Sequence, residues 1–230
     1  MAKESAAKQE SALIVGVGPG LSASLARLCA KQGMAVSLAA RNTDKLVSLV
    51  AETGARAYAC DVSSPEAVAR LFAAVEGDTG VPDLVVFNPS ARQRAPIAEL
   101  DPEKVRQALL VSCFGGFLVG QAAAKAMLER GSGSILFTGA TASVKGVANS
   151  APFAMGKFGL RGLCQSMARE LAPKGIHVAH FVIDGGIGKD PAGNAKLDPD
   201  AIAETYLHIH RQHPSAWTWE MELRPWVETF

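Results

Sequence analysis

Short apolar runs alternate with longer amphipathic segments along most of the chain. The apolar runs have the length of buried strands, without polar alternation, and lie at 13–15, 35–40, 56–60, 83–88, 134–139 and 176–183. Between them, apolar residues recur at helical spacing over 23–30, 43–52, 64–76, 101–129 and 153–171. Strands that are apolar on both sides need cover on both faces, which right-handed crossover helices provide. The pattern predicts an α/β fold: a single doubly wound parallel sheet with helices on both faces.

The two ends of the chain depart from this alternation. Residues 1–10 are polar and mixed in charge, so we expect a flexible tail before a single domain over 11–230. Gly, Pro, Asp and Lys are frequent in 185–198, which predicts a loop over about 184–200. A helix at 198–212 and a last strand at 217–223 are expected to follow.

A glycine-rich turn joins the first predicted strand to the first helix. Glycine lets the backbone turn tightly and lets a ligand approach bare N–H groups, and the helix dipole favours an anion there. The pyrophosphate of a dinucleotide is the anion expected at such a turn. The alternative is a plain strand–helix turn without a ligand. The candidate residues are Gly16, Gly18, Gly20, Leu21 and Ser22.

Charge and composition narrow the classes of partner. Lysine and arginine number 23 against 22 aspartates and glutamates, and without a basic run we expect neither nucleic acid nor an anionic membrane as partner. Residues 107–124 carry no charge and are nearly long enough to span a bilayer. We expect this stretch instead to be a helix buried against the sheet or a partner subunit.

The cysteines and two histidines suggest no metal site. The four cysteines lie far apart in apolar surroundings, which predicts reduced thiols in a cytoplasmic protein. His177 and His180 share one predicted strand and point to opposite faces, so we expect one packed and one exposed side chain. No metal ligand is therefore predicted.

Several motifs resemble those of the short-chain dehydrogenase/reductase family over nearly the whole chain. Gly16 and Gly20 match its T-G-x-x-x-G-x-G turn, and Asp61-Val62 resembles its adenine-binding D-V. Residues 87–90 (FNPS) resemble its N-N-A-G motif and keep Asn88. Residues 153–163 resemble its Y-x-x-x-K helix without the tyrosine. The resemblance implies a Rossmann-type dinucleotide-binding domain whose substrate pocket the 184–200 loop covers.

The resemblance also implies which residues surround the reacting atoms. In the family a tyrosine protonates the substrate oxygen, and a lysine lowers that tyrosine's pKa and holds the nicotinamide ribose. Lys157 is present, whereas Phe153 stands at the tyrosine position. Ala140 stands at the position of the substrate-binding serine, where Thr141 or Ser143 is an alternative. The family's water-relay asparagine corresponds to Ser112.

Two functions remain open from these residues. The first is an oxidoreductase acting on a small carbonyl or alcohol, with a proton from water, Thr141, Ser143, Tyr206 or Lys157. The second is a cofactor-binding protein without catalysis, kept for sensing or assembly, because Phe153 has no proton to give. Both readings retain a nicotinamide dinucleotide as cofactor and, for the enzyme, a small molecule as substrate.

The second strand indicates which dinucleotide is bound. An acidic residue at its end would bind the 2′-hydroxyl of NAD, and none occurs in 35–42. Arg41 stands there and is suited to a 2′-phosphate, which favours NADP(H) over NAD(H). The alternative is that Arg41 only extends into solvent.

The long helices at 101–129 and 153–171 carry more apolar surface than one sheet face hides. Gly115, Gly116 and the alanines at 122–124 would let another helix approach closely. We therefore expect a homodimer or homotetramer assembled through these helices, as in the resembled family.

Overall fold

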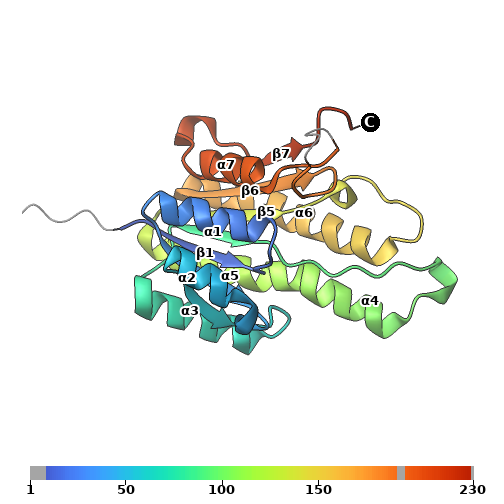
Figure 1. Cartoon of the computed structure of the whole chain (residues 1–230), viewed down its shortest axis with the longest axis horizontal. Coiled ribbons are helices and arrows are strands. Elements are labelled where there is room, and N and C mark those ends of the chain that lie inside the picture. The colour runs from blue at the N-terminus through green and yellow to red at the C-terminus, as the bar shows by residue number, and fades with distance from the viewer. Residues whose placement is uncertain (1–8, 191–194, 229–230) are drawn as a thin grey trace, which may run out of the picture.

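The computed structural model describes residues 9–190 and 195–228, and these form one seven-stranded parallel sheet in the order β3-β2-β1-β4-β5-β6-β7 (Figure 1). The predicted doubly wound parallel sheet is confirmed. The switch in strand order falls between β1 and β4, which places a crevice at the carboxyl ends of the strands. The strands are β1 (Ser11–Val15), β2 (Ala35–Ala40), β3 (Arg56–Ala59), β4 (Leu84–Phe87), β5 (Gly133–Thr138), β6 (Ile176–Ile183) and β7 (Glu220–Leu223).

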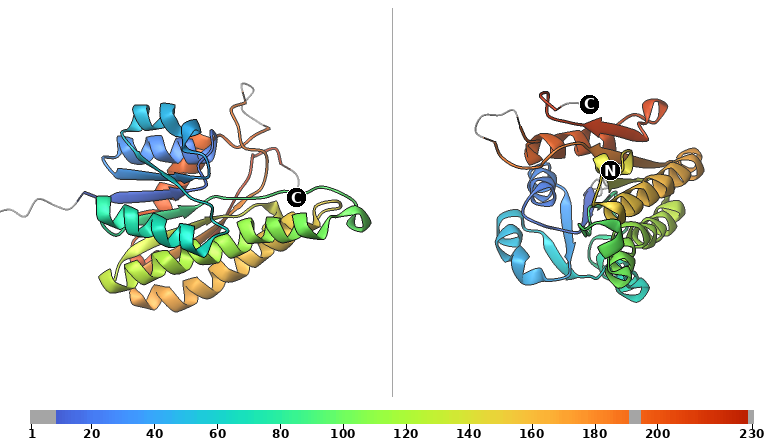
Figure 2. Two further views of the ribbon diagram at one scale, coloured as in Figure 1. Left: turned by 90° about the horizontal axis from the view of Figure 1, so that it is seen from below. Right: turned by 90° about the vertical axis from the view of Figure 1, so that its right-hand side faces the viewer.

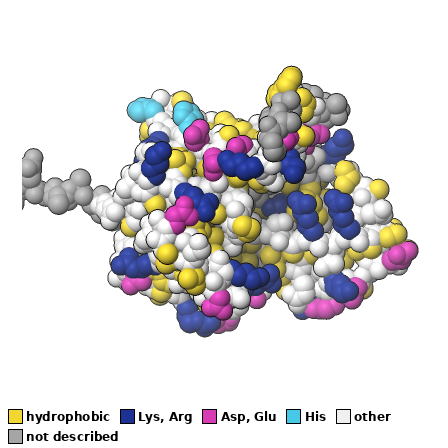
Figure 3. Space-filling model, in the orientation of Figure 1, with side chains coloured by type: hydrophobic (Ala, Val, Ile, Leu, Met, Phe, Trp, Pro, Cys, Tyr) yellow, Lys and Arg dark blue, Asp and Glu magenta, His cyan; other side chains and the backbone are white. Residues whose placement is uncertain are grey.

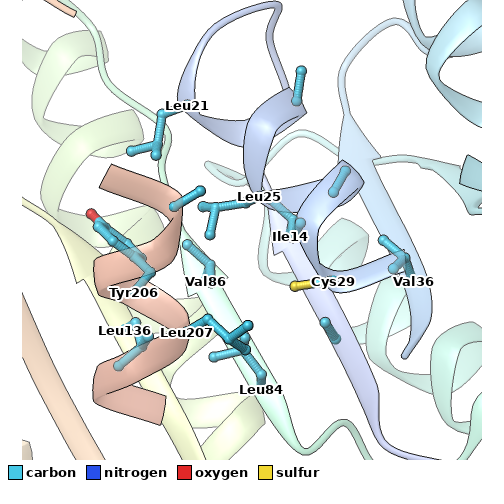
Figure 4. Packing of buried hydrophobic residues seen from close by; sticks show 14 of the residues in the cluster. Ile14, Leu21, Leu25, Cys29, Val36, Leu84, Val86, Leu136, Tyr206 and Leu207 are labelled. Atoms are coloured by element: carbon cyan, nitrogen blue, oxygen red, sulfur yellow. The ribbon is translucent and has the colours of Figure 1, made fainter. Parts of the chain in front are cut away.

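Helices cover both faces of the sheet and bury two apolar clusters (Figure 2). On one face, α1 and α7 pack side by side with Leu25 and Tyr206 above Ile14 and Val86, as Figure 4 shows. That face carries α1 (Leu21–Lys31), α2 (Val47–Thr53) and α7 (Pro199–His210). The other carries α3 (Pro65–Thr79), α4 (Pro102–Leu109), α5 (Gly115–Arg130) and α6 (Ala151–Leu171).

The helix expected over 101–129 is not regular. A π-helical turn, Leu110–Phe114, separates α4 from α5. Such turns insert one extra residue and re-aim the side chains around them. Among the described residues, the stretch Pro102–Arg130 is also the one helix whose length and composition would suit a membrane span, and 39% of its most apolar window is buried in the protein.

The glycines of α5 make close contacts inside the chain. A β-carbon on Gly116 would collide with Leu160 of α6, and one on Gly115 would lie 2.9 Å from Val62. These two glycines therefore bring α5 against its own sheet and neighbour helix. The close approach of another helix that the sequence predicts is made at Gly116 by α6 of the same chain.

The chain ends are bound more tightly than expected. Residues 1–8 of the predicted tail lie outside the described residues, but Gln9 donates a 2.8 Å hydrogen bond to the carbonyl of Gly33, and the Glu10 carboxylate contacts His210 and Arg211. The predicted loop at 184–200 is closed by a bridge between Ile187 and Leu197; residues 191–194 lie outside the described part.

Candidate functional site

Two adjoining pockets lie at the carboxyl ends of the strands and share Asn88 and Ser90. Figure 3 shows how charged and hydrophobic side chains are distributed on the face of the molecule drawn in Figure 1. The first, which we call the β2 compartment, has a volume of about 300 Å³ and is lined by Gly16, Val17, Ala39, Ala40, Arg41, Cys60, Asp61, Val62, Pro89 and Val111 besides the shared pair. The second, the β6 compartment, has about 540 Å³ and lies beyond the ends of β5 and β6. Together they form one groove across the switch point of the sheet.

The glycine turn borders the β2 compartment. Gly16 has φ +84°, and a β-carbon there would lie 2.6 Å from the backbone nitrogen of Pro89. Beside Gly18 and Gly20 a β-carbon would meet nothing within 4 Å, so the surface above them is open. The first turn of α1 carries no acidic residue. The amides of Ala23 and Ser24 donate to the carbonyl of Gly20, whereas those of Leu21 and Ser22 lack an acceptor within the helix. The turn is thus shaped to receive an anion.

Ser22 and Asn88 hold this turn in place. The Ser22 hydroxyl donates to the carbonyl of Gly16 at 3.2 Å and accepts from the Asn88 side chain at 2.7 Å. Ser22 is buried, and so is the side chain of Leu21. Their side chains therefore do not reach an anion, and only their backbone amides remain for the contact predicted from the sequence.

The structure brings Arg41, Asp61 and Val62, three of the residues predicted to contact a cofactor, together in the lining of the β2 compartment. The Asp61 carboxylate accepts bonds from the Ser63 hydroxyl (2.7 Å) and amide (3.0 Å). These bonds, with a smaller contribution from the charge of Arg41, lower the pKa of Asp61. The compartment thus holds a fixed carboxylate and an exposed guanidinium at its two strand ends.

Lys157 lies in the wall of the β6 compartment, fully enclosed by protein. Its ammonium donates a 2.6 Å bond to the carbonyl of Thr138. Burial, and secondarily the charge of Arg92, lower the pKa of Lys157 to about 7. Burial in this wall therefore favours the neutral amine of Lys157 over the ammonium.

Phe153 and Ala140 line the same compartment, and neither carries a hydroxyl. The Arg92 guanidinium lies over the Phe153 ring at 4.4 Å from its centroid, and the Lys157 ammonium is at 6.0 Å. Ser112 is not in the lining. It sits in the π-helical turn, where its hydroxyl accepts from the amide of Ala91 at 3.1 Å and fixes the segment after β4.

The side chains that the sequence analysis names as possible proton donors differ in whether they reach the β6 compartment. Thr141 lines the β6 compartment and donates to Asp184 at 2.5 Å. Tyr206 is in the core, where burial raises its pKa and its hydroxyl donates to Thr138. Ser143 is also fully buried. Of the side chains considered, Thr141 and Lys157 reach the compartment, whereas Ser143 and Tyr206 do not.

A buried polar chain that the sequence did not indicate lies behind this wall. The His180 ring bonds Glu220 through Nδ1 (3.1 Å) and Ser143 through Nε2 (3.2 Å). Because a carboxylate only accepts, His180 carries its proton on Nδ1 and accepts from Ser143. Burial lowers the pKa of His180 to about 4, so the ring is neutral. Arg161 pairs with Glu220 at 2.6 Å.

Both histidines of β6 are buried, so the expectation of one exposed ring is wrong. His177 stacks on Trp217 with ring centroids 4.7 Å apart. The reason is that β7 pairs in parallel with β6. Glu220 of β7 bonds the His180 ring, and Trp217, just before β7, covers the His177 ring. The sequence held one signal for this arrangement. Glu220 lies among apolar residues in the predicted strand at 217–223, and a carboxylate in such a strand requires a polar partner on a neighbouring element.

Comparisons with known proteins agree on the family. The family model for short chain dehydrogenases matches residues 10–190, so the chain belongs to the short-chain dehydrogenase family. The 3-oxoacyl-[acyl-carrier-protein] reductase MabA of Mycobacterium tuberculosis is 29% identical over 180 residues, which are 78% of this chain and 70% of that protein.

Two solved structures show the same likeness in three dimensions. A short-chain dehydrogenase from Rhodopseudomonas palustris is 37% identical with a TM-score of 0.85, covering 94% of this chain and 99% of that one. A metagenomic short-chain oxidoreductase in complex with NADP is 26% identical with a TM-score of 0.84, covering 94% and 97%.

Proposed function

We propose that this protein is an NADP(H)-dependent oxidoreductase that interconverts a small carbonyl compound and its alcohol. The observation that carries the proposal is the continuous groove, which has Arg41 at one end, the glycine turn beside it and Lys157 at the other end. Binding a dinucleotide along this groove would place its reactive ring in the β6 compartment. Membership of the short-chain dehydrogenase family supports the same class of reaction.

The β2 compartment fits a 2′-phosphorylated adenosine. Arg41 is exposed in its lining, Asp61 is already engaged by Ser63, and β2 ends without an acidic residue that would repel a phosphate. The NADP complex of the metagenomic oxidoreductase and a polyketide ketoreductase with NADPH, 25% identical to this chain, support this choice of cofactor.

Lys157 takes the place of the missing tyrosine as the proton donor. A bound NADPH supplies a hydride. The chain must supply a proton for the carbonyl oxygen, and neither Phe153 nor Ala140 holds one. Lys157 holds a proton at Nζ, lines the compartment, and has a pKa of about 7, which suits general acid catalysis at neutral pH.

Cofactor binding tests the first half of the proposal. NADPH and NADH are titrated while their fluorescence is followed, with wild type, Arg41→Asp and, as a matched control, Arg56→Asp at the amino end of the neighbouring strand β3. We expect Arg41→Asp to weaken NADPH binding about ten- to a hundredfold, since a hydrogen bond to a charged group contributes about 1.5–3 kcal/mol. NADH and the control should change little. Equal losses for both cofactors would contradict the role of Arg41.

Turnover tests the second half. A panel of aldehydes and ketones is screened with NADPH at 340 nm, and oxidation by any of them supports the enzyme. The alternative function, a cofactor-binding protein used for sensing or assembly, is favoured by one observation: a phenyl ring covered by Arg92 stands where the family holds its proton donor. Tight NADPH binding without turnover on the whole panel would support that alternative.

A further inference from the structure

The β6 compartment is lined by side chains of one charge. Arg92 and Arg94 reach it from the segment after β4, Lys145 from the segment after β5, and Lys157 from α6. Its described lining contains no aspartate or glutamate. A hollow with basic walls concentrates positive potential and attracts anions.

Three of these cations lack a counterion. Among the described residues, no carboxylate lies within ion-pair distance of Arg92, Arg94 or Lys145. Other basic residues nearby are neutralised: Arg161 pairs with Glu220, and Arg224 with Asp184 at 2.7 Å. Arg161 and Arg224 are thus paired, whereas the three cations in the lining of the β6 compartment are left to attract an anion.

The proposed cofactor does not account for this excess. Its 2′-phosphate is assigned to Arg41 in the β2 compartment, and its pyrophosphate to the amides of the glycine turn. Lys157 is assigned to the proton. Arg92, Arg94 and Lys145 line the β6 compartment and are left without a role in binding the cofactor.

The Phe153 ring positions the Arg92 guanidinium by a cation–π interaction. A guanidinium over an aromatic face is held by the ring's negative potential, and the 4.4 Å distance of Arg92 from the ring centroid is within the range of this interaction. A phenol at this position would serve as an acid. The phenyl ring serves as a platform that holds Arg92 at the compartment.

We infer that the substrate is an anionic carbonyl compound, bearing a carboxylate or a phosphate, and that Arg92, Arg94 and Lys145 bind this anionic group. That the substrate contains a carbonyl group rests on the proposed function. That the site binds an anion is inferred only from the side chains that line the β6 compartment. Guanidinium groups suit either anion, because their paired N–H groups match both carboxylate and phosphate oxygens.

Binding to the NADP⁺-saturated protein tests the inference by calorimetry. The probes are 4-carboxybenzaldehyde, 4-formylphenyl phosphate and the neutral methyl 4-formylbenzoate. We expect one or both anions to bind at least tenfold more tightly than the ester, and to lose that advantage as NaCl is raised, because salt screens exposed charges. The better of the two anions identifies which group the substrate bears.

Arg94→Gln and Lys145→Gln should each weaken the better anion several-fold and leave the ester unchanged. Phe153→Leu, which removes the platform under Arg92, should do the same. Lys31→Gln, an exposed charge at the far end of α1, is the control and should have no effect. NADPH affinity should be unchanged in Arg94→Gln, Lys145→Gln and Lys31→Gln.

Equal or undetectable binding of anions and ester in the wild type would overturn the inference. So would a matched loss of NADPH affinity in Arg94→Gln and Lys145→Gln, because these cations would then serve the cofactor's phosphates. Selective anion binding without NADPH oxidation by any probe would support the anion site and count against the proposed reductase, so the two failures are distinguishable.

Discussion

At the scale of single residues, Phe153 and Ala140 line the β6 compartment with Lys157, at the positions where the resemblance places a tyrosine and a serine. Their positions could be predicted from the sequence, since they follow from spacing within one helix and one strand end. The lowered pKa of Lys157 could not be predicted from the sequence, because it arises from burial and from the charge of Arg92, which belongs to a distant segment of the chain. The inward turn of Ser22 likewise depends on Asn88, far away in the chain.

The pH dependence of reduction tests Lys157. Carbonyl reduction needs the protonated amine, so the rate should be highest below pH 7 and fall as pH rises through about 7, while alcohol oxidation shows the reverse. Lys157→Arg stays charged throughout and should lose this inflection along with most activity. Arg92→Gln should move the inflection to higher pH, because a positive neighbour is removed. The measurement is kcat/KM from pH 5 to 9; an inflection that survives in Lys157→Arg would exclude Lys157 as its source.

Introducing the two hydroxyl groups that the resemblance places at these positions tests whether a phenol can act as the acid in this site. The double variant Phe153→Tyr with Ala140→Ser places a phenol near Lys157 and a hydroxyl at the end of β5. We expect reduction of simple neutral aldehydes to rise, but by less than the factor of about 10²–10⁴ that a positioned general acid contributes, because Lys157 already supplies a proton. Ala140→Ser alone is the control. A wild type faster than the double variant would mean that its proton donor lies elsewhere.

At the scale of elements, boundaries set by local signals were predictable and those set by packing were not. Pro65, Pro102 and Pro199 begin helices as expected, each behind a residue whose side chain caps the first turn. The π-helical turn at 110–114 could not be predicted from the sequence. The helix after it begins with Gly115 and Gly116, whose close contacts with Val62 and Leu160 are visible only in the folded structure.

The glycine turn yields a prediction with its own control. Gly16→Ala should lower the free energy of unfolding by at least about 1–3 kcal/mol, because alanine is strained at φ +84° and would also press on Pro89. Gly18→Ala meets nothing within 4 Å and should leave the stability unchanged, yet its methyl group would block close approach of a pyrophosphate. Urea unfolding and NADPH titration separate the two effects. Unaltered NADPH binding by Gly18→Ala would contradict the predicted contact.

At the scale of the whole molecule, the alternation of strands and helices sufficed to predict the sheet, because right-handed crossovers leave few arrangements of parallel strands. The parallel pairing of β7 with β6 was not predictable. It depends on Glu220 meeting Arg161 and His180, which lie on other elements.

We propose that the outer face of α4–α6 joins copies of this chain as a homodimer or homotetramer. Exposed on it are Phe114, Phe117, Met155 and Phe158, around an apolar groove. Phe117→Glu should shift the protein to a monomer, because a charge would be buried in an apolar contact. Val47→Glu, on α2, is the control. Sedimentation at micromolar concentration measures the outcome, and a monomeric wild type would refute the assembly.

The late position of Glu220 in the sequence determines which parts of the protein can fold first during translation. Every residue predicted to touch the cofactor precedes it in the chain, so those groups leave the ribosome first. Until the final strand follows, His180 and Arg161 lack their shared carboxylate, and Ser143 lacks an anchored ring to hold it. A nascent chain should therefore be able to fold around its nucleotide before its substrate pocket takes its final shape.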